Sequence, residues 1–94
     1  MSDNNNSREL SRIFKILSVQ NRVKIIQLLK EDTLCVNALA KKLDISPAAV
    51  SQHLRILRNA DIVTDDKQGY YVHYSINKDK LHTWKELTSE LLSD

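Results

Sequence analysis

Four side chains in the segment 45–59 have types and a spacing that suit contact with DNA bases: Ala48, Ser51, Gln52 and Arg55. On a helix, at about 100° per residue, these positions fall on one face. Small side chains at Ala48 and Ser51 permit close approach to a major groove. The Gln52 amide can pair with a base edge, and the Arg55 guanidinium can reach a guanine or a phosphate. An ordinary amphipathic helix with a solvated polar face is the alternative, and residue types alone do not separate the two.

The residues before this face predict where its helix begins. Ser46 is a favourable N-cap, and Pro47 suits the first helical position. Ile45 and Val50 stand at the N′ and N4 positions, where a hydrophobic staple packs. We therefore expect a helix over 46–59 whose opposite, apolar face carries Val50, Leu54 and Leu57.

A short helix is predicted immediately upstream, after an extended link at 33–35, from the apolar residues Val36, Leu39, Ala40 and Leu43. Only residues 44–46 separate the two helices, and a turn of three or four residues between helices is typical of a helix-turn-helix. Asp44 stands where many such turns carry glycine, and Asp tolerates the left-handed region better than most residues. This context favours DNA binding over a merely solvated face.

Apolar residues at helical spacing predict three further helices. The first covers about 7–18, the second about 20–31, and the last about 77–92. Residues 1–6 are polar, and we expect them to form a disordered N-terminal tail. Residues 7–94 then form a single domain, because a chain of 94 residues is near the small end of the sizes that bury a core unaided.

Between residues 62 and 76 the apolar spacing changes to a period of two. Strands are predicted at 62–64 and 70–76, and residues 65–69 have the composition of a turn, which includes Gly69. The expected fold is mainly α with a small β-hairpin (α+β). Its element order, α-α-α-α-β-β-α, is that of a winged helix-turn-helix.

The charge of the chain is unevenly distributed. Lys and Arg number 14 against 12 Asp and Glu, a net charge of +2 that does not by itself indicate a nucleic-acid binder. Residues 41–60 carry four basic side chains against Asp44 alone, a local charge of +3. The basic excess therefore lies on the predicted helix-turn-helix.

The cysteine content and the hydropathy bear on the cellular compartment. A single cysteine, Cys35, excludes an internal disulfide. No stretch approaches the ~20 apolar residues needed to span a bilayer, and no apolar signal segment is visible. We expect a soluble, cytoplasmic protein without a membrane partner.

Three segments resemble the ArsR/SmtB family of bacterial transcriptional repressors. They are LSVQNRVKIIQLL (17–29), LCVNALAKKLDISPAAVSQHLRILRNADIV (34–63) and GYYVHYSI (69–76), and the resemblance extends from about Leu10 to Trp84. It implies a homodimer that occupies a palindromic double-stranded DNA operator and leaves it when an inducer binds. Two-fold symmetry would place the two DNA-reading helices about 34–36 Å apart. The residues that the resemblance directs into the major groove are Ser46, Ala48, Ser51, Gln52 and Arg55.

The resemblance also assigns roles to the hairpin and to the terminal helices. Tyr70 stands where the family often has Arg, so Lys67 and Gln68 are the hairpin residues expected to contact the DNA backbone or the minor groove. Trp84 would anchor a dimer interface, because aromatic side chains dominate such contacts. A purely intramolecular core is the alternative for these apolar stripes. The expected interface consists of Leu10, Ile13, Phe14, Leu17, Leu81, Trp84, Leu87 and Leu91.

Cys35 offers half of the family's thiolate metal site. That site has the arrangement L-C-V-C, whereas residues 34–37 read L-C-V-N. One thiolate and one amide are a poor ligand set for a soft ion. A reversible redox role is a further possibility, but no second cysteine exists in the chain to resolve a sulfenic acid.

The last helix matches the family's other metal site only in part. Asp79, His82 and Glu86 are weak candidate ligands, with Glu90 as a further one, and the pair that a partner subunit would supply is missing. We therefore expect no metal and no cofactor. The sequence predicts no particular effector.

The residues also bear on functions other than that of a DNA-binding repressor. Ser51 and His53 point about 200° apart on a helix, so they cannot act as nucleophile and base, and no enzyme is predicted. His53 is expected at the edge of the core. The alternatives are a winged helix that docks residues 46–59 on a protein partner and a metal-sensing regulator with the degenerate site on the last helix.

Overall fold

The computed structural model describes the backbone of residues 2–94 and the side chains of residues 6–94. Within this range the elements are α1 (Ser2–Leu17), α2 (Gln20–Glu31), β1 (Leu34–Cys35), α3 (Val36–Leu43), α4 (Pro47–Asn59), β2 (Val63–Gln68), β3 (Tyr71–Ile76) and α5 (Lys78–Leu92). The predicted winged helix-turn-helix is confirmed, with one strand more than expected.

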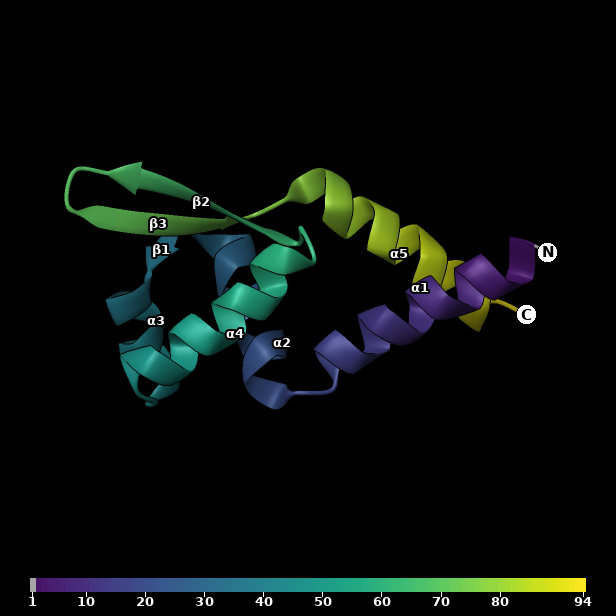
Figure 1. Ribbon diagram of the computed structural model, residues 1–94, viewed down its shortest axis with the longest axis horizontal. Helices are drawn as coiled ribbons and strands as arrows, with labels where there is room; N and C mark the ends of the chain where they lie inside the picture. The colour runs from purple at the N-terminus through teal and green to yellow at the C-terminus, as the bar shows by residue number, and fades with distance from the viewer. Residues whose placement is uncertain (1) are drawn as a thin grey trace.

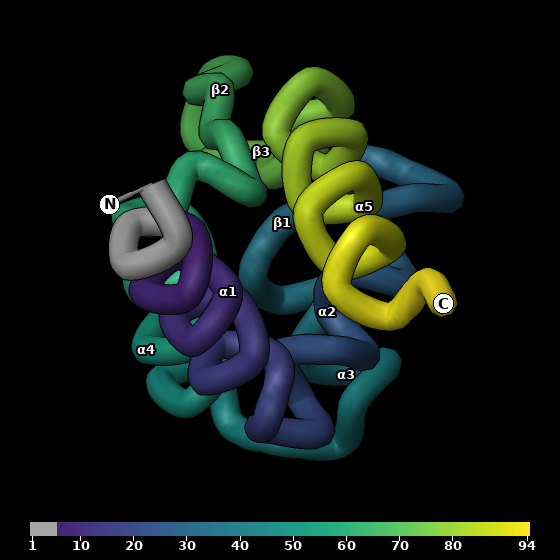
Figure 2. The backbone as a smooth tube through the Cα atoms, turned by 90° about the vertical axis from the view of Figure 1, so that its right-hand side faces the viewer, coloured from purple at the N-terminus to yellow at the C-terminus, as the bar shows by residue number. Residues whose placement is uncertain are grey.

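The molecule consists of a body and a projecting arm (Figure 1). Helices α1 and α5 form the arm and carry both ends of the chain away from the sheet, α3 and α4. Figure 2 looks along the arm and shows α1 and α5 as neighbouring coils in front of the body. The extents of 47 × 23 × 20 Å correspond to this elongated shape. None of the helices in the described range has the length and apolar character needed to cross a bilayer.

One hydrophobic core joins the arm to the body. Helix α1 contributes Ile13 and α5 contributes Trp84, which are 1% and 4% exposed. Burial of one large apolar side chain contributes about 1.5–3 kcal/mol, so this shared core holds the arm and the body together. The other members include Ile25, Ile26, Leu29, Leu39, Ala40, Val50, Leu54, Leu57, Ala60, Ile62 and Val63.

Helix α1 starts earlier than the sequence predicted. It begins at Ser2 rather than at Ser7, so residues 2–6, expected to belong to a disordered tail, are part of the helix. Each residue added to an existing helix gains one hydrogen bond, and extension therefore costs little once the core holds the following turns. Met1, also part of the expected tail, lies outside the described residues.

The extended link predicted before α3 is a strand of the sheet. In β1, Leu34 lies opposite Tyr74 and Cys35 lies opposite His73, in an antiparallel ladder. The strand order is β1-β3-β2, so β3 is the central strand. A strand of two residues is too short to show a period in the sequence, which is why its pairing was not predicted.

The turn predicted at 65–69 was placed wrongly. Residues 65–68 belong to β2, and Gln68 pairs with Tyr71 across the hairpin. All residues of β2 after Val63 are exposed, so they have the composition of a turn although their backbone is extended. Only Gly69 and Tyr70 remain in the loop. Gly69 has a φ of +64° and Tyr70 has no positive φ, as in a two-residue type II′ turn.

Replacement of this glycine tests the turn. We expect Gly69→Ala to lower the free energy of unfolding by about 1–2 kcal/mol, because L-residues are strained at positive φ. Steric overlap makes no contribution, since no heavy atom lies within 4 Å of the added Cβ. Urea unfolding measures the change. The neighbouring exposed strand residue gives the control, Gln68→Ala, with a change below about 0.5 kcal/mol. A Gly69→Ala protein as stable as the wild type would contradict this turn.

Candidate nucleic-acid interface

The outer face of α4 is open to solvent, as its helical spacing predicted. The gathering of small, amide and guanidinium side chains on one unobstructed helix face is the arrangement that contact with a major groove requires. The residues of this face are all exposed: Ser46, Ala48, Ser51, Gln52 and Arg55.

Two backbone features fix where α4 begins. The Ser46 hydroxyl oxygen accepts a hydrogen bond from the Ala49 backbone N–H at 3.1 Å, and Pro47 occupies the first helical position. Asp44 ends α3 in the left-handed conformation, with a φ of +56° and a ψ of +47°. The predicted N-cap and the predicted left-handed turn residue are therefore both confirmed.

The apolar underside of α4 fixes the rotation of the helix about its axis. Val50, Leu54 and Leu57 are at most 1% exposed. A rotation that turned these three side chains toward water would cost several kcal/mol, on the scale of about 1.5–3 kcal/mol for each. The polar face consequently has to point outward.

A groove of about 290 Å³ runs between α4 and β3. At its side, Arg58 Nε lies 3.3 Å from Asp65 Oδ1, so an ion pair joins the end of α4 to β2. Its contribution to stability is small, because the Arg58 side chain is 60% exposed. The sequence did not predict this pair, because the polar composition of residues 65–69 indicates a turn and not a strand. The lining consists of Ser51, Leu54, Arg55, Arg58, Asn59 and Tyr74.

The two hairpin residues predicted to contact DNA lie on opposite faces of the hairpin. Lys67 follows Asp65 by two positions in β2, so both side chains share the face that meets Arg58 of α4. Gln68 points to the other face, where its amide donates a hydrogen bond to Asp66 Oδ2 at 3.3 Å. The structure therefore brings Lys67, but not Gln68, to the side of α4.

The apolar stripes of α1 and α5 are only partly available to a second subunit. Trp84, proposed from the sequence as the anchor of a dimer, belongs to the core of the single chain, as do Leu10 and Ile13. Phe14 and Leu91 are 40% and 52% exposed. The remaining members of the predicted interface are half-buried: Leu17, Leu81 and Leu87.

An apolar hollow of about 370 Å³ opens between α1, α2 and α5. Its floor is formed by Ile13, Ile26 and Trp84 of the core, and Leu17 and Leu81 flank it. The sequence periodicity predicted the apolar stripes of α1 and α5. It could not predict the hollow, because the hollow depends on how α1 and α5 pack against α2.

The candidate metal ligands do not gather in the described part of the chain. No group of three or more His, Cys, Asp or Glu side chains there is placed to hold a metal ion. His82 Nε2 lies 3.0 Å from Glu86 Oε1 on the exposed side of α5. Cys35 is half-buried at the junction of β1 and α3, opposite His73.

His53 lies half-buried on the flank of α4, as expected for a histidine at the edge of the core. Burial lowers the pKa of His53 below its usual value of 6.5, and the positive charge of Arg22 on α2 lowers it further. Arg22 itself donates from Nη1 to the Ile16 carbonyl oxygen at 3.4 Å. Ser51 of the same helix is exposed to solvent, whereas His53 is half-buried and lies near the charge of Arg22.

The chain is similar to bacterial regulators in sequence and in structure. Residues 20–65 match the family described as bacterial regulatory protein, arsR family. The transcriptional repressor SdpR of Bacillus subtilis is 34% identical over 68 residues, which cover 72% of this chain and 76% of SdpR. The cadmium resistance transcriptional regulatory protein CadC of Listeria innocua is 42% identical over 79 residues, which cover 83% of this chain but only 66% of CadC. The structure of reduced HlyU from Vibrio cholerae aligns with a TM-score of 0.80 at 27% identity, over 99% of this chain and 98% of HlyU.

The lowered pKa of His53 predicts a pH dependence of stability. Because the folded protein disfavours the protonated imidazole, the free energy of unfolding is at its full value above pH 6.5. It falls as the pH decreases through 6.5 toward the lowered pKa, since the unfolded chain binds the proton more readily.

Urea unfolding at about pH 7.5 and about pH 5.5 measures this loss. We expect His53→Gln to lose less stability between the two pH values than the wild type does. The control is Gln52→Ala on the same helix, which removes an exposed side chain without a titratable group and should lose as much as the wild type. An equal loss in His53→Gln and wild type would contradict the assignment.

Proposed function

This chain belongs to the arsR family of bacterial regulatory proteins, and from that premise we propose that it is a homodimeric transcriptional repressor of double-stranded DNA operators. The observation that carries the proposal is the exposed polar face of α4 above its buried apolar underside. In this proposal α4 is the recognition helix, and binding of an effector releases the DNA.

The recognition helix enters a major groove with Ala48 and Ser51 closest to the bases. Gln52 hydrogen-bonds a base edge, because an amide matches the donor and acceptor pattern of adenine. Arg55 contacts a guanine or a phosphate. Ser46 adds little to base reading, since its hydroxyl oxygen caps the helix.

The basic residues near α4 neutralise phosphates and supply most of the affinity. Arg55 on α4 and Lys67 on the α4 side of the hairpin are exposed and make this contact. Arg58 contributes less, because its guanidinium is paired with Asp65. Gln68, on the opposite face of the hairpin, reaches the DNA backbone only at the flank of the site.

A second copy of the chain packs against the arm. Helices α1 and α5 carry the exposed apolar residues Phe14, Leu91 and Leu92, and an apolar hollow opens between these helices and α2. Together they offer an apolar surface that a symmetry mate covers. Trp84 supports this surface from below and does not anchor it. Two-fold symmetry places the recognition helices in successive major grooves, about 34–36 Å apart.

Selection of bound sequences from random duplexes tests the proposed function. We expect an inverted repeat whose half-sites lie one helical turn apart, and affinity that falls steeply with salt as bound phosphates release counterions. Selection without any sequence preference, or affinity that is indifferent to salt, would contradict a sequence-specific DNA-binding function.

Gln52→Ala tests base reading by the recognition helix. We expect the affinity for the selected operator to decrease by about 1–3 kcal/mol and the preference at one base pair of each half-site to relax. Quantitative gel shifts on the operator and on random duplex measure both effects. The control is Gln20→Ala, an exposed glutamine on α2 outside the proposed contact face. Equal weakening on operator and random duplex would show that Gln52 does not read a base.

Leu91→Glu tests the dimer surface. A carboxylate at this exposed apolar position would be buried without a partner in a dimer, so we expect a shift toward monomer in sedimentation. Glu86→Lys changes the charge on the exposed side of the same helix, about 140° from Leu91, and should sediment as the wild type. A Leu91→Glu protein that remains as dimeric as Glu86→Lys would place the interface elsewhere.

A further inference from the structure

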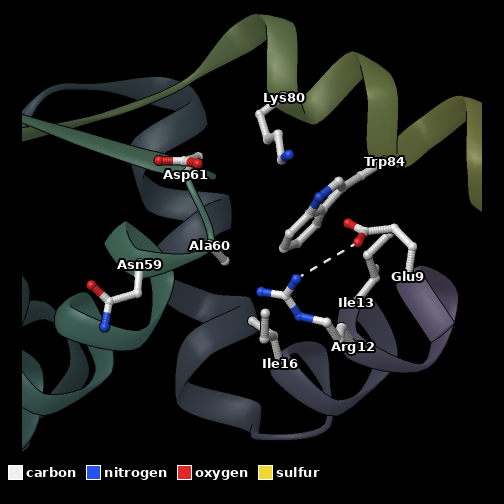
Figure 3. Close-up of a pocket in the computed structure, with 9 residues that line it drawn as sticks. All are labelled: Glu9, Arg12, Ile13, Ile16, Asn59, Ala60, Asp61, Lys80 and Trp84. Carbon is white, nitrogen blue, oxygen red and sulfur yellow. Dashed lines mark ion pairs between the residues drawn. The ribbon is translucent and has the colours of Figure 1, made fainter. Parts of the chain in front are cut away.

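A small polar pocket lies where the arm meets the body (Figure 3). It has a volume of about 100 Å³ and opens between α1, the end of α4 and the start of α5. None of the DNA contacts proposed above involves it. Its polar lining consists of Glu9, Arg12, Asn59, Asp61, Lys80 and Trp84.

The Trp84 indole in this pocket has a hydrogen-bond donor without an acceptor. The residue is 4% exposed, and within the described part of the chain Nε1 finds no partner. Buried donors in native proteins are nearly always satisfied, because an unmade hydrogen bond forfeits the hydration that the group had in the unfolded chain. Trp84 Nε1–H is therefore free to donate to a group that enters the pocket.

Lys80 supplies a second donor at the same place. In Figure 3 the ammonium end of Lys80 faces the edge of the indole that carries the nitrogen. An ammonium group and an indole N–H can only donate hydrogen bonds. An oxygen acceptor between these two donors would accept a hydrogen bond from each, and the positive charge of Lys80 favours an anionic one.

The remaining charges and the size of the pocket restrict this anion. Arg12 Nη1 lies 3.8 Å from Glu9 Oε2, and Asp61 adds a second carboxylate. Two cations and two carboxylates leave the lining without net charge, which disfavours dianions such as phosphate and sulfate. A water molecule takes about 30 Å³ of liquid volume, so a pocket of about 100 Å³ has room for a few non-hydrogen atoms.

We propose that this pocket binds a small monocarboxylate. One carboxylate oxygen accepts the hydrogen bond from Trp84 Nε1 and pairs with the Lys80 ammonium group. The flexible four-carbon stem of Lys80 turns aside to admit the ligand. Because the pocket is shared by α1, α4 and α5, the ligand contacts the arm and the end of the proposed recognition helix at once.

The chain has a single tryptophan, so one indole N–H resonance in a nitrogen-resolved proton NMR spectrum reports on Nε1 directly. The titration uses acetate, with chloride replaced at constant ionic strength so that screening stays the same. We expect a saturable downfield shift of the indole proton as Nε1–H gains an acceptor.

Two lysine variants make the test specific. Lys80→Gln should weaken acetate binding by about tenfold or more, since it removes the charged partner. The variant keeps the cap of α5, because Asn77 Oδ1 accepts from the backbone N–H of residue 80, at 3.3 Å. Lys78→Gln removes the same charge from an exposed position on α5 and should bind acetate like the wild type.

An indole resonance that does not move, that moves without saturation, or that titrates equally in Lys80→Gln and wild type would overturn the proposal. The titration contains no DNA. A negative titration would therefore contradict carboxylate binding in this pocket. It would not bear on the proposed repressor function, which the selection of duplexes tests.

Discussion

The burial of Val50, Leu54 and Leu57 beneath α4 is the constraint on which the rest of the structure depends. These three side chains leave the helix only one rotation about its axis, and that rotation exposes Ser51, Gln52 and Arg55. The cap at the start of α4 and the left-handed turn before it set the position of the helix along its axis. The orientation of the solvent-facing side of α4 is thus set by the packing of the residues on the opposite side of the helix.

The sequence predicted the boundaries of an element best where the local capping residues and the apolar period indicate the same boundary. The start of α4 combines a cap, a proline and an apolar period, and each of these indicates the same boundary. The hairpin lacked such agreement, because residues 65–68 are exposed on both faces and their polar composition does not distinguish a strand from a turn. Trp84 shows another limit. Its period places it on an apolar face, but a period does not tell whether the same chain or a second one covers that face.

The ion pair between Arg58 and Asp65 changes how the basic charge near α4 is distributed. Counted along the sequence, residues 41–60 carry a local charge of +3. In the fold, Asp65 from β2 neutralises one of these charges and lies on the side of the hairpin that meets α4. The pairing also removes a free carboxylate from a surface that would otherwise repel phosphates. Arg55 is then an exposed cation on the outer face of α4, and Lys67 is an exposed cation further along β2.

The arm and the body are not independent parts. Ile13 of α1, Trp84 of α5 and Ala60 at the end of α4 belong to one buried cluster, so a change in the angle of the arm has to repack the end of α4. In a dimer built on the arm, that angle would also set the separation of the two α4 helices. Close-packed cores move between discrete arrangements and do not deform continuously. The junction that holds Trp84 is therefore the place in this chain where a few bound atoms act on the surfaces proposed for both DNA binding and dimerisation.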